Sequence, residues 1–359
     1  MERLAKIAAL TMVAALSFSA AFAQEADVAG TQPAADAQPV AEAQPAADTQ
    51  PVAEVPPVAA TQETVAKLDA VPGVQTMFSQ VFVDKSFKEI DIDLGSEDFV
   101  LIVAPSDRTT LEIKSNKHDF IPLVTQDEKS LKVVQKNKKV KTDGRICTVV
   151  LTVPQNFPPA EFELSMLSGV ATLDPIVADS VEIAVGNGTL AAKDILANKE
   201  FELSVNAGKA TLASVETGET GEAEIAAGNG TVTVERVRAG KKLAVAANAG
   251  SLALAHAETR SFSGAVKKGL LTAADVTAES VAVAVDSGKA TVDLAKVFSR
   301  ASSLLVGSGK LALSLPADSV FYTTASVNKG QFDSEFPSSN KGPELKVKIG
   351  KGTAAVTKR

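Results

Sequence analysis

Seven glutamates in the middle of the sequence are the residues whose type and spacing could support chemistry. Four of them stand six residues before a glycine that returns about every twenty residues, and three lie two residues earlier on the same alternating phase. The seven residues of this glutamate ladder are Glu161, Glu163, Glu182, Glu200, Glu202, Glu222 and Glu224. If successive repeats stack as strands, neighbouring carboxylates lie about 5 Å apart. Like charges aligned across strands destabilise a sheet, so something must compensate them.

Three interpretations of the glutamate ladder are open. The side chains can extend into water with counter-ions around them, or they can bind a divalent cation or a basic ligand. Alternatively, an upstream basic run can fold over them. That run consists of Lys129, Lys132, Lys136, Lys138, Lys139, Lys141 and Arg145. The ladder is the one candidate ligand or partner patch that the sequence offers, and only the first interpretation leaves it without such a role.

Other reactive residue types indicate no catalytic, metal or cofactor site. His118 and His256 occur in unrelated contexts, and neither has the spacing of a metal-ligand pair. Cys147 is the only cysteine and precedes an apolar strand pattern, which favours a buried thiol over a nucleophile. The G-x-G triplets lie between expected strands and not before a helix, so they are not phosphate loops. We therefore expect no enzymatic activity and no cofactor.

A repeat of about twenty residues must position the ladder. Its marker glycines are Gly169, Gly188, Gly208, Gly230, Gly250, Gly269, Gly288, Gly309, Gly330 and Gly352. Residues three and five before the glycine, and two and four after it, are mostly apolar, which predicts two short strands with one buried face each. Gly, Asn or Asp usually stands two residues before the glycine, so we expect left-handed backbone there and at the glycine itself.

This pattern predicts an all-β fold. We expect residues 160–359 to form a right-handed parallel β-solenoid (β-helix-like) of about ten coils, with equivalent strands stacked in register. A chain of β-hairpins is the alternative, because Asn187-Gly188 and Asn229-Gly230 suit tight turns. Residues 75–159 alternate less regularly and are expected to form an irregular capping region, with bulky residues closing both ends of the rod.

The N-terminus has the pattern of a secretory signal peptide over residues 1–23. Arg3 and Lys6 precede an apolar run, and Ala21-Phe22-Ala23 forms a cleavage motif. Residues 24–63 are rich in Ala, Pro and Gln and predict a disordered acidic spacer. This spacer accounts for the acidity of the chain, since residues 64–359 carry a net charge of −1. A near-neutral body argues against nucleic-acid binding, and no stretch of the mature chain is long and apolar enough to cross a bilayer.

Three segments carry a resemblance to a known family. They are SFKEIDIDL near residue 90, LTVPQNFPPAEFELSMLSGVATL after it, and the closing LKVKIGKGTAAVTKR. Over about residues 76–359 the chain resembles the bacterial putative-adhesin β-strand-repeat family, related to the putative auto-transporter adhesin head (GIN) domain. The resemblance implies an exported right-handed β-helix-like domain and supplies no catalytic residues.

The sequence therefore predicts an exported, non-enzymatic protein that is adhesin-like or has a structural or interaction role in the cell envelope. Its partner is an unknown protein or envelope component, and its location is the periplasm, the cell surface or the medium. Two alternatives are a β-helix carbohydrate-binding or carbohydrate-active protein and a self-assembling envelope scaffold. The absence of Trp and the single Tyr322 disfavour a sugar site.

Overall fold

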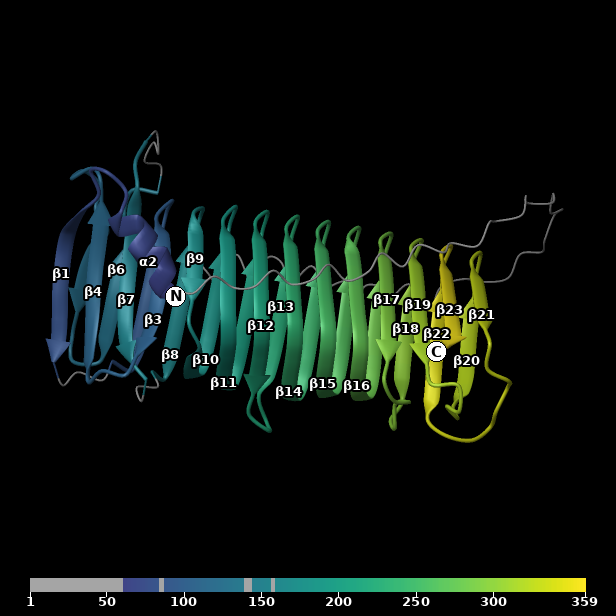
Figure 1. The fold of residues 1–359 in the computed structure, drawn as a ribbon. Helices are drawn as coiled ribbons and strands as arrows, with labels where there is room; N and C mark the ends of the chain where they lie inside the picture. The colour runs from purple at the N-terminus through teal and green to yellow at the C-terminus, as the bar shows by residue number, and fades with distance from the viewer. Residues whose placement is uncertain (1–60, 84–86, 139–143, 156–158) are drawn as a thin grey trace.

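A computed structural model describes residues 61–83, 87–138, 144–155 and 159–359 of the chain (Figure 1). The expected signal peptide lies outside the described residues. So does the expected spacer, except for its last three residues, where helix α2 (Thr61–Asp69) begins. In the part of the chain that is described, no helix is both long and apolar enough to span a membrane.

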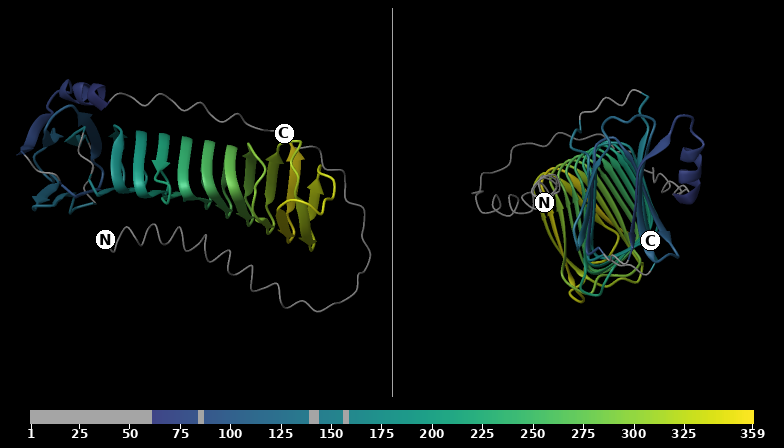
Figure 2. Two further views of the ribbon diagram at one scale, coloured as in Figure 1. Left: turned by 90° about the horizontal axis from the view of Figure 1, so that it is seen from below. Right: turned by 90° about the vertical axis from the view of Figure 1, so that its left-hand side faces the viewer.

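The repeats form stacked parallel coils, which confirms the predicted β-solenoid of about ten turns (Figures 1 and 2). Strands that run into the repeat glycines stack as row 1, and strands that leave them stack as row 2. Row 1 contains β8 (Glu161–Met166), β10 (Ile176–Val185), β11 (Thr189–Val205), β13 (Glu222–Ala227), β14 (Thr231–Ala247), β15 (Ser251–Val266), β16 (Leu270–Val285), β18 (Ser302–Val306), β22 (Glu344–Ile349) and β20 (Tyr322–Val327). Row 2 contains β9 (Val170–Leu173), the first halves of β11, β14, β15 and β16, and β12 (Lys209–Thr217), β17 (Lys289–Leu294), β19 (Lys310–Leu315), β23 (Thr353–Lys358) and β21 (Gln331–Ser334). Pairing within both rows is parallel, so the hairpin alternative is wrong.

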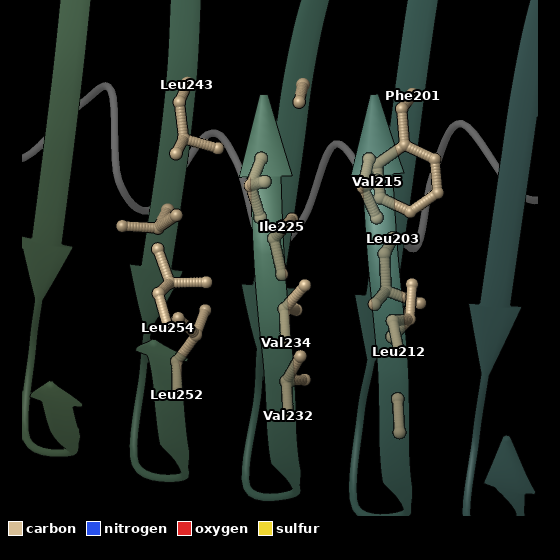
Figure 3. Close-up of a cluster of buried hydrophobic side chains, with 14 of the residues drawn as sticks. Phe201, Leu203, Leu212, Val215, Ile225, Val232, Val234, Leu243, Leu252 and Leu254 are labelled. Carbon is tan, nitrogen blue, oxygen red and sulfur yellow. The ribbon is translucent and has the colours of Figure 1, made fainter. Parts of the chain in front are cut away.

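The core follows from the alternation within each strand. Leu203 and Val205 before Gly208, and Ala210 and Leu212 after it, are all buried. The alternate residues Ser204 and Lys209 are not buried. The equivalents of the buried residues in neighbouring coils, such as Ile225 and Val234, stack on them to form one continuous core (Figure 3). Burial of each such aliphatic side chain contributes about 1.5–3 kcal/mol, which stabilises the stack coil by coil.

Close stacking of the backbone, and not left-handed geometry, explains the repeat glycine. Of the ten marker glycines only Gly169 has a positive φ, of 105°, and none of the Asn or Asp residues two positions earlier has one. The expectation of left-handed backbone in every repeat is therefore wrong. A Cβ added to Gly250 would lie 2.2 Å from the carbonyl oxygen of Gly230 one coil earlier, and Gly208 stands in the same relation to Gly188. The coils approach too closely at this corner for any side chain.

The coils stack in sequence order except at the two ends. At the C-terminal end, β22 pairs with both β18 and β20, and β23 pairs with both β19 and β21. The last coil in the sequence is thus inserted before the preceding one, and β20 and β21 become outermost (Figure 1). The N-terminal end repeats the arrangement, since β2 (Glu89–Leu94) pairs with both β8 and β6 (Ser130–Val134). Similarly, β3 (Asp98–Ala104) pairs with both β9 and β7 (Cys147–Pro154).

Antiparallel strands close the N-terminal end. β4 (Arg108–Ser115) pairs with β7 and with β1 (Gln75–Val83), and β5 (Leu123–Gln126) pairs with β6. Phe82 and Phe87 meet there edge to face, with ring centroids 5.1 Å apart. Val65 of α2 packs on the outside of β3 and β7, and Lys114 binds Asp69 at 2.5 Å. At the other end Phe321 packs between Phe298 and Phe336.

Candidate functional site

Row 1 brings four glutamates of the ladder into direct register. Glu163 on β8 is paired with Glu182 on β10, Glu182 with Glu202 on β11, and Glu202 with Glu224 on β13. All four are half-buried and point away from the core, since the residue after each of them is a buried Leu or Ile. The predicted outward line of carboxylates therefore exists as a continuous row.

The other three glutamates form a second, interrupted line. Ser180 separates Glu161 from Glu200, because it pairs with both of them on either side. Glu200 and Glu222 are direct partners. The structure therefore brings six of the seven residues into contact along the row and leaves Glu161 at one margin of it.

Two further acids extend the ladder toward the N-terminus. On β2, Asp91 pairs with Glu163 and Glu89 pairs with Glu161. The alternating Ile90-Asp91-Ile92-Asp93 pattern of this strand was visible in the sequence, but its position beside β8 was not. The run of outward acids thus spans five neighbouring strands.

Lysines compensate the row at both of its ends. On β6, the Lys132 Nζ lies 2.7 Å from a Glu89 oxygen and 3.6 Å from an Asp91 oxygen. On β14, the Lys242 Nζ lies 3.3 Å from Glu224 and 4.0 Å from Glu222. The adjacent Lys241 binds Glu222 at 2.5 Å. These contacts neutralise the carboxylates at the two ends of the row. The carboxylates in the middle of the ladder repel one another without a nearby cation among the described residues.

Among the described residues, no cation of the upstream basic run forms an ion pair with the seven glutamates. Lys138 pairs with Asp93, Lys132 pairs with β2, and Arg145 pairs with Glu97, so these cations reach acids upstream of the seven glutamates. The reason is the coil order, which places β2 between the basic strand β6 and the first ladder strand β8. Lys139 and Lys141 lie outside the described residues.

The middle carboxyls are weak acids in this setting. The pKa of Glu163 is raised to about 7, first by burial and then by the charges of Asp91 and Glu182. The pKa of Glu202 is likewise raised to about 7, first by burial and then by the charges of Glu182, Glu200 and Glu224. The pKa of Glu182 is also raised, first by burial and then by Glu200. Glu163 and Glu202 therefore titrate near neutral pH.

A groove continues from the ladder along the outer surface of row 1. It has a volume of about 400 Å³ and crosses β10, β11, β13, β14, β15, β16 and β18. Glu182, Glu202 and Glu224 line one end of it, with Lys242 beside them. The remaining outward residues are small or aliphatic and are Ala184, Ser204, Ala226, Ala244, Ala246, Ser263, Ala265, Ala282, Ala284, Ser303 and Leu305. The small outward residues of row 1 thus line a groove, and one end of that groove is formed by the carboxylates of the ladder.

The histidines and the cysteine lie away from this groove. His256 is exposed, and its Nδ1 lies 2.9 Å from an Asp275 oxygen, while His118 is exposed near the N-terminal end. Cys147 is buried, and burial raises the pKa of its thiol to about 11, which makes it a poor nucleophile. Within the described ranges, no group of three or more His, Cys, Asp or Glu residues is arranged to hold a metal ion.

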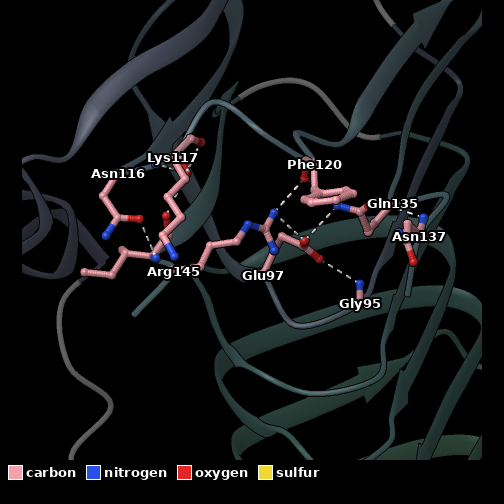
Figure 4. A network of polar contacts seen from close by, with 10 residues as sticks. Gly95, Glu97, Asn116, Lys117, Phe120, Gln135, Asn137 and Arg145 are labelled. Carbon is pink, nitrogen blue, oxygen red and sulfur yellow. Dashed lines mark hydrogen bonds and ion pairs between the residues drawn. The ribbon is translucent and has the colours of Figure 1, made fainter. Parts of the chain in front are cut away.

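A buried polar network at the N-terminal turns was not predicted from the sequence (Figure 4). The Glu97 carboxylate is fully buried, and Arg145 Nη2 donates to it at 2.9 Å. Gly95 N–H and Gln135 Nε2 also donate to this carboxylate, at 2.8 and 2.9 Å. Arg145 and Gln135 both donate to the Phe120 carbonyl. Three protein donors therefore hold the Glu97 carboxylate, and the network fixes the end turns, while the buried Arg145 Nε has no hydrogen-bond partner among the described residues.

The comparisons with known proteins concern almost the whole solenoid. The family model described as Toastrack DUF4097 matches residues 87–358. A crystal structure of a putative lipid binding protein from Parabacteroides distasonis is 15% identical, with a TM-score of 0.47, covering 79% of this chain and 97% of that one. A putative adhesin from the same organism is 18% identical, with a TM-score of 0.46 and coverage of 78% and 96%. A putative adhesin from Parabacteroides merdae is 17% identical, with a TM-score of 0.38 and coverage of 79% and 96%. No curated protein matches the chain.

Proposed function

This chain belongs to the Toastrack DUF4097 family, and we propose that it is an exported, non-enzymatic, adhesin-like interaction protein of the cell envelope. The observation that carries the proposal is the groove of row 1 with carboxylates at one end. The relation to the auto-transporter adhesin head domain, the signal peptide of residues 1–23 and the spacer of residues 24–63 are part of the same proposal. In this proposal, the spacer of residues 24–63 holds the solenoid at a distance from the envelope surface.

The shape of the groove defines the kind of partner. Its floor crosses seven neighbouring strands of row 1, so it suits an elongated segment that lies along the rod axis. Alanine and serine side chains allow an apolar or backbone surface of a partner to approach closely. These small side chains also lose little conformational entropy when a partner covers them. We propose that an extended stretch of an envelope component binds there.

The acidic end of the groove defines the charge of the partner. A cationic group placed between Glu182 and Glu202 would favour their ionised forms and thus oppose the burial that raises their pKa values. Such a group would also supply the compensation that Lys132 and Lys242 provide only at the two ends of the row. The partner therefore carries a basic group at one end. Binding would release protons and strengthen as the pH rises through about 7.

Two matched alanine substitutions test this function. Ala265 lies in the groove, and Ala253 is an equally half-buried, outward-facing alanine on row 2 of the adjoining part of β15. Ala265→Phe should abolish capture of envelope components by the immobilised protein, whereas Ala253→Phe should leave capture unchanged. Equal capture by both variants would contradict the groove as the binding surface. Glu182→Gln combined with Glu202→Gln should remove the pH dependence of capture.

A further inference from the structure

In the described part of the chain, the C-terminal end of the solenoid presents a strand edge without a further partner strand. Among the described residues, β20 pairs only with β22, and β21 pairs only with β23. Thr323, Ala325 and Val327 are in register with Leu345, Val347 and Ile349, which are all buried, so they face the interior of the rod. They are nevertheless exposed, with Val327 at 42%, because no further coil lies over them in the described structure.

The backbone of β20 offers unsatisfied hydrogen-bonding groups on its free side. The Tyr322 N–H donates to the Pro343 carbonyl at 3.1 Å, and the Asn328 N–H donates to the Ile349 carbonyl at 2.9 Å. Residues of a strand alternate in the direction of their N–H and C=O groups. The groups of Thr323, Ala325 and Val327 therefore point away from β22 into the open edge.

This edge lacks the usual protection against pairing with another strand. Natural edge strands are shortened, bulged, or provided with lysine or proline. The six residues of β20 are YTTASV, which include no proline and no Lys, Arg, Asp or Glu. The other end is different, because its strands β1, β4 and β5 pair antiparallel, and the pairing of its edge strand β1 shifts register between Thr76 and Phe78.

We propose that a second copy of this chain pairs with β20 through the same edge, giving a closed end-to-end dimer. With the two-fold axis at Ala325, antiparallel pairing places Ala325 opposite its equivalent and Thr323 opposite Val327 of the other copy. These are the residues whose backbone groups face the edge, so each pair exchanges both of its N–H···O bonds. All of their side chains also point to the same, interior side, so the two cores become continuous.

The charges of the edge favour β20 over β21 as the paired strand. Within β20 no ionisable carboxylate or ammonium group would face its equivalent, whereas β21 carries Asp333, which would approach its own copy across a two-fold. Pairing through one self-complementary strand uses up that edge in both copies. The assembly therefore stops at two rods and does not grow into a filament. This inference is independent of what binds the groove.

Disulfide capture tests the two-fold axis directly. In the proposed register the Cα atoms of residue 325 in the two copies lie about 5.5 Å apart, which is within disulfide range. The purified full chain with Ala325→Cys should form a covalent dimer under mild oxidation, and the unmodified chain should not, since its only thiol, Cys147, is buried. A chain that sediments as a monomer at all concentrations, and gives no covalent dimer, would overturn the proposal.

Charge substitutions separate this dimer from other modes of association. Ala325→Asp and Ala325→Lys should each weaken the dimer by about a hundredfold or more, because like charges meet at the axis. An equimolar mixture of the two variants should recover it, which also shows that both are folded. Ser79→Asp, on the exposed face of the distant strand β1, is the control and should have no effect. Head-to-tail growth would be sensitive to Ser79→Asp, and that result would refute the two-fold arrangement.

Discussion

Replacement of Glu202 by Gln should stabilise the solenoid above neutral pH. The pKa of this carboxyl is raised from an ordinary 4.5 to about 7, mainly by burial. Below pH 4.5 it is protonated in both the folded and the unfolded chain. Between pH 4.5 and about 7 only the folded chain keeps the proton, so stability falls as the pH rises through this window. Above it the ionised side chain remains in an unfavourable setting, and that cost is what Gln removes.

The size of the effect follows from the change in proton affinity. A rise from 4.5 to about 7 corresponds to at most about 3 kcal/mol. Because the side chain is only half-buried, solvent screening reduces the expected value to about 1 kcal/mol. Glu202→Gln should therefore raise the urea midpoint at pH 8 and have little effect at pH 4.5.

The measurement is urea unfolding followed by circular dichroism at both pH values. Glu219→Gln is the matched control, since Glu219 is exposed in the bend between β12 and β13 and lies away from the ladder. This variant should unfold like the unmodified chain at each pH. A loss of stability in Glu202→Gln at pH 8, or an equal gain at both pH values, would refute the reasoning.

Two further predictions concern the scaffold. Gly250→Ala should cost about 1–3 kcal/mol or more, because the new Cβ would meet the Gly230 carbonyl oxygen, and faster amide exchange in β14 and β15 would report it; Ala253→Ser should change exchange little. Arg145→Ala should destabilise the N-terminal turns by about 3–5 kcal/mol by leaving the Glu97 carboxylate buried without its cation. Adding Glu97→Gln should recover part of that loss, and amide exchange in β2 and β6 would measure both.

The architecture could be predicted from the sequence because the repeat carries its own period. Alternation around each marker glycine determined which residues face the core, and it placed Glu163, Glu182, Glu202 and Glu224 correctly on the outer surface. Parallel stacking then follows from the near-constant spacing. Both the fold and the central row of the candidate site therefore came from local patterns.

The features that could not be predicted from the sequence depend on which coils are neighbours in the stack. The need for glycine at position 250 comes from a contact with Gly230, one coil away, which turn chemistry within the repeat does not reveal. The inserted coils at both ends depend on long-range pairing, and they explain why Lys132 reaches Asp91 and not the seven glutamates. One signal was available, because Lys242 occupies the repeat position that Glu222 holds one coil earlier.

The central claim of the proposed function is that the groove of row 1 binds the partner. Site-specific photo-crosslinking in intact cells tests this most directly. A photoreactive residue is placed at Ala226 in the groove and, as a control, at Ala253 on row 2. We predict a discrete crosslinked envelope component from position 226 and none from position 253. Crosslinking from position 253 alone, or equally from both positions, would contradict the account.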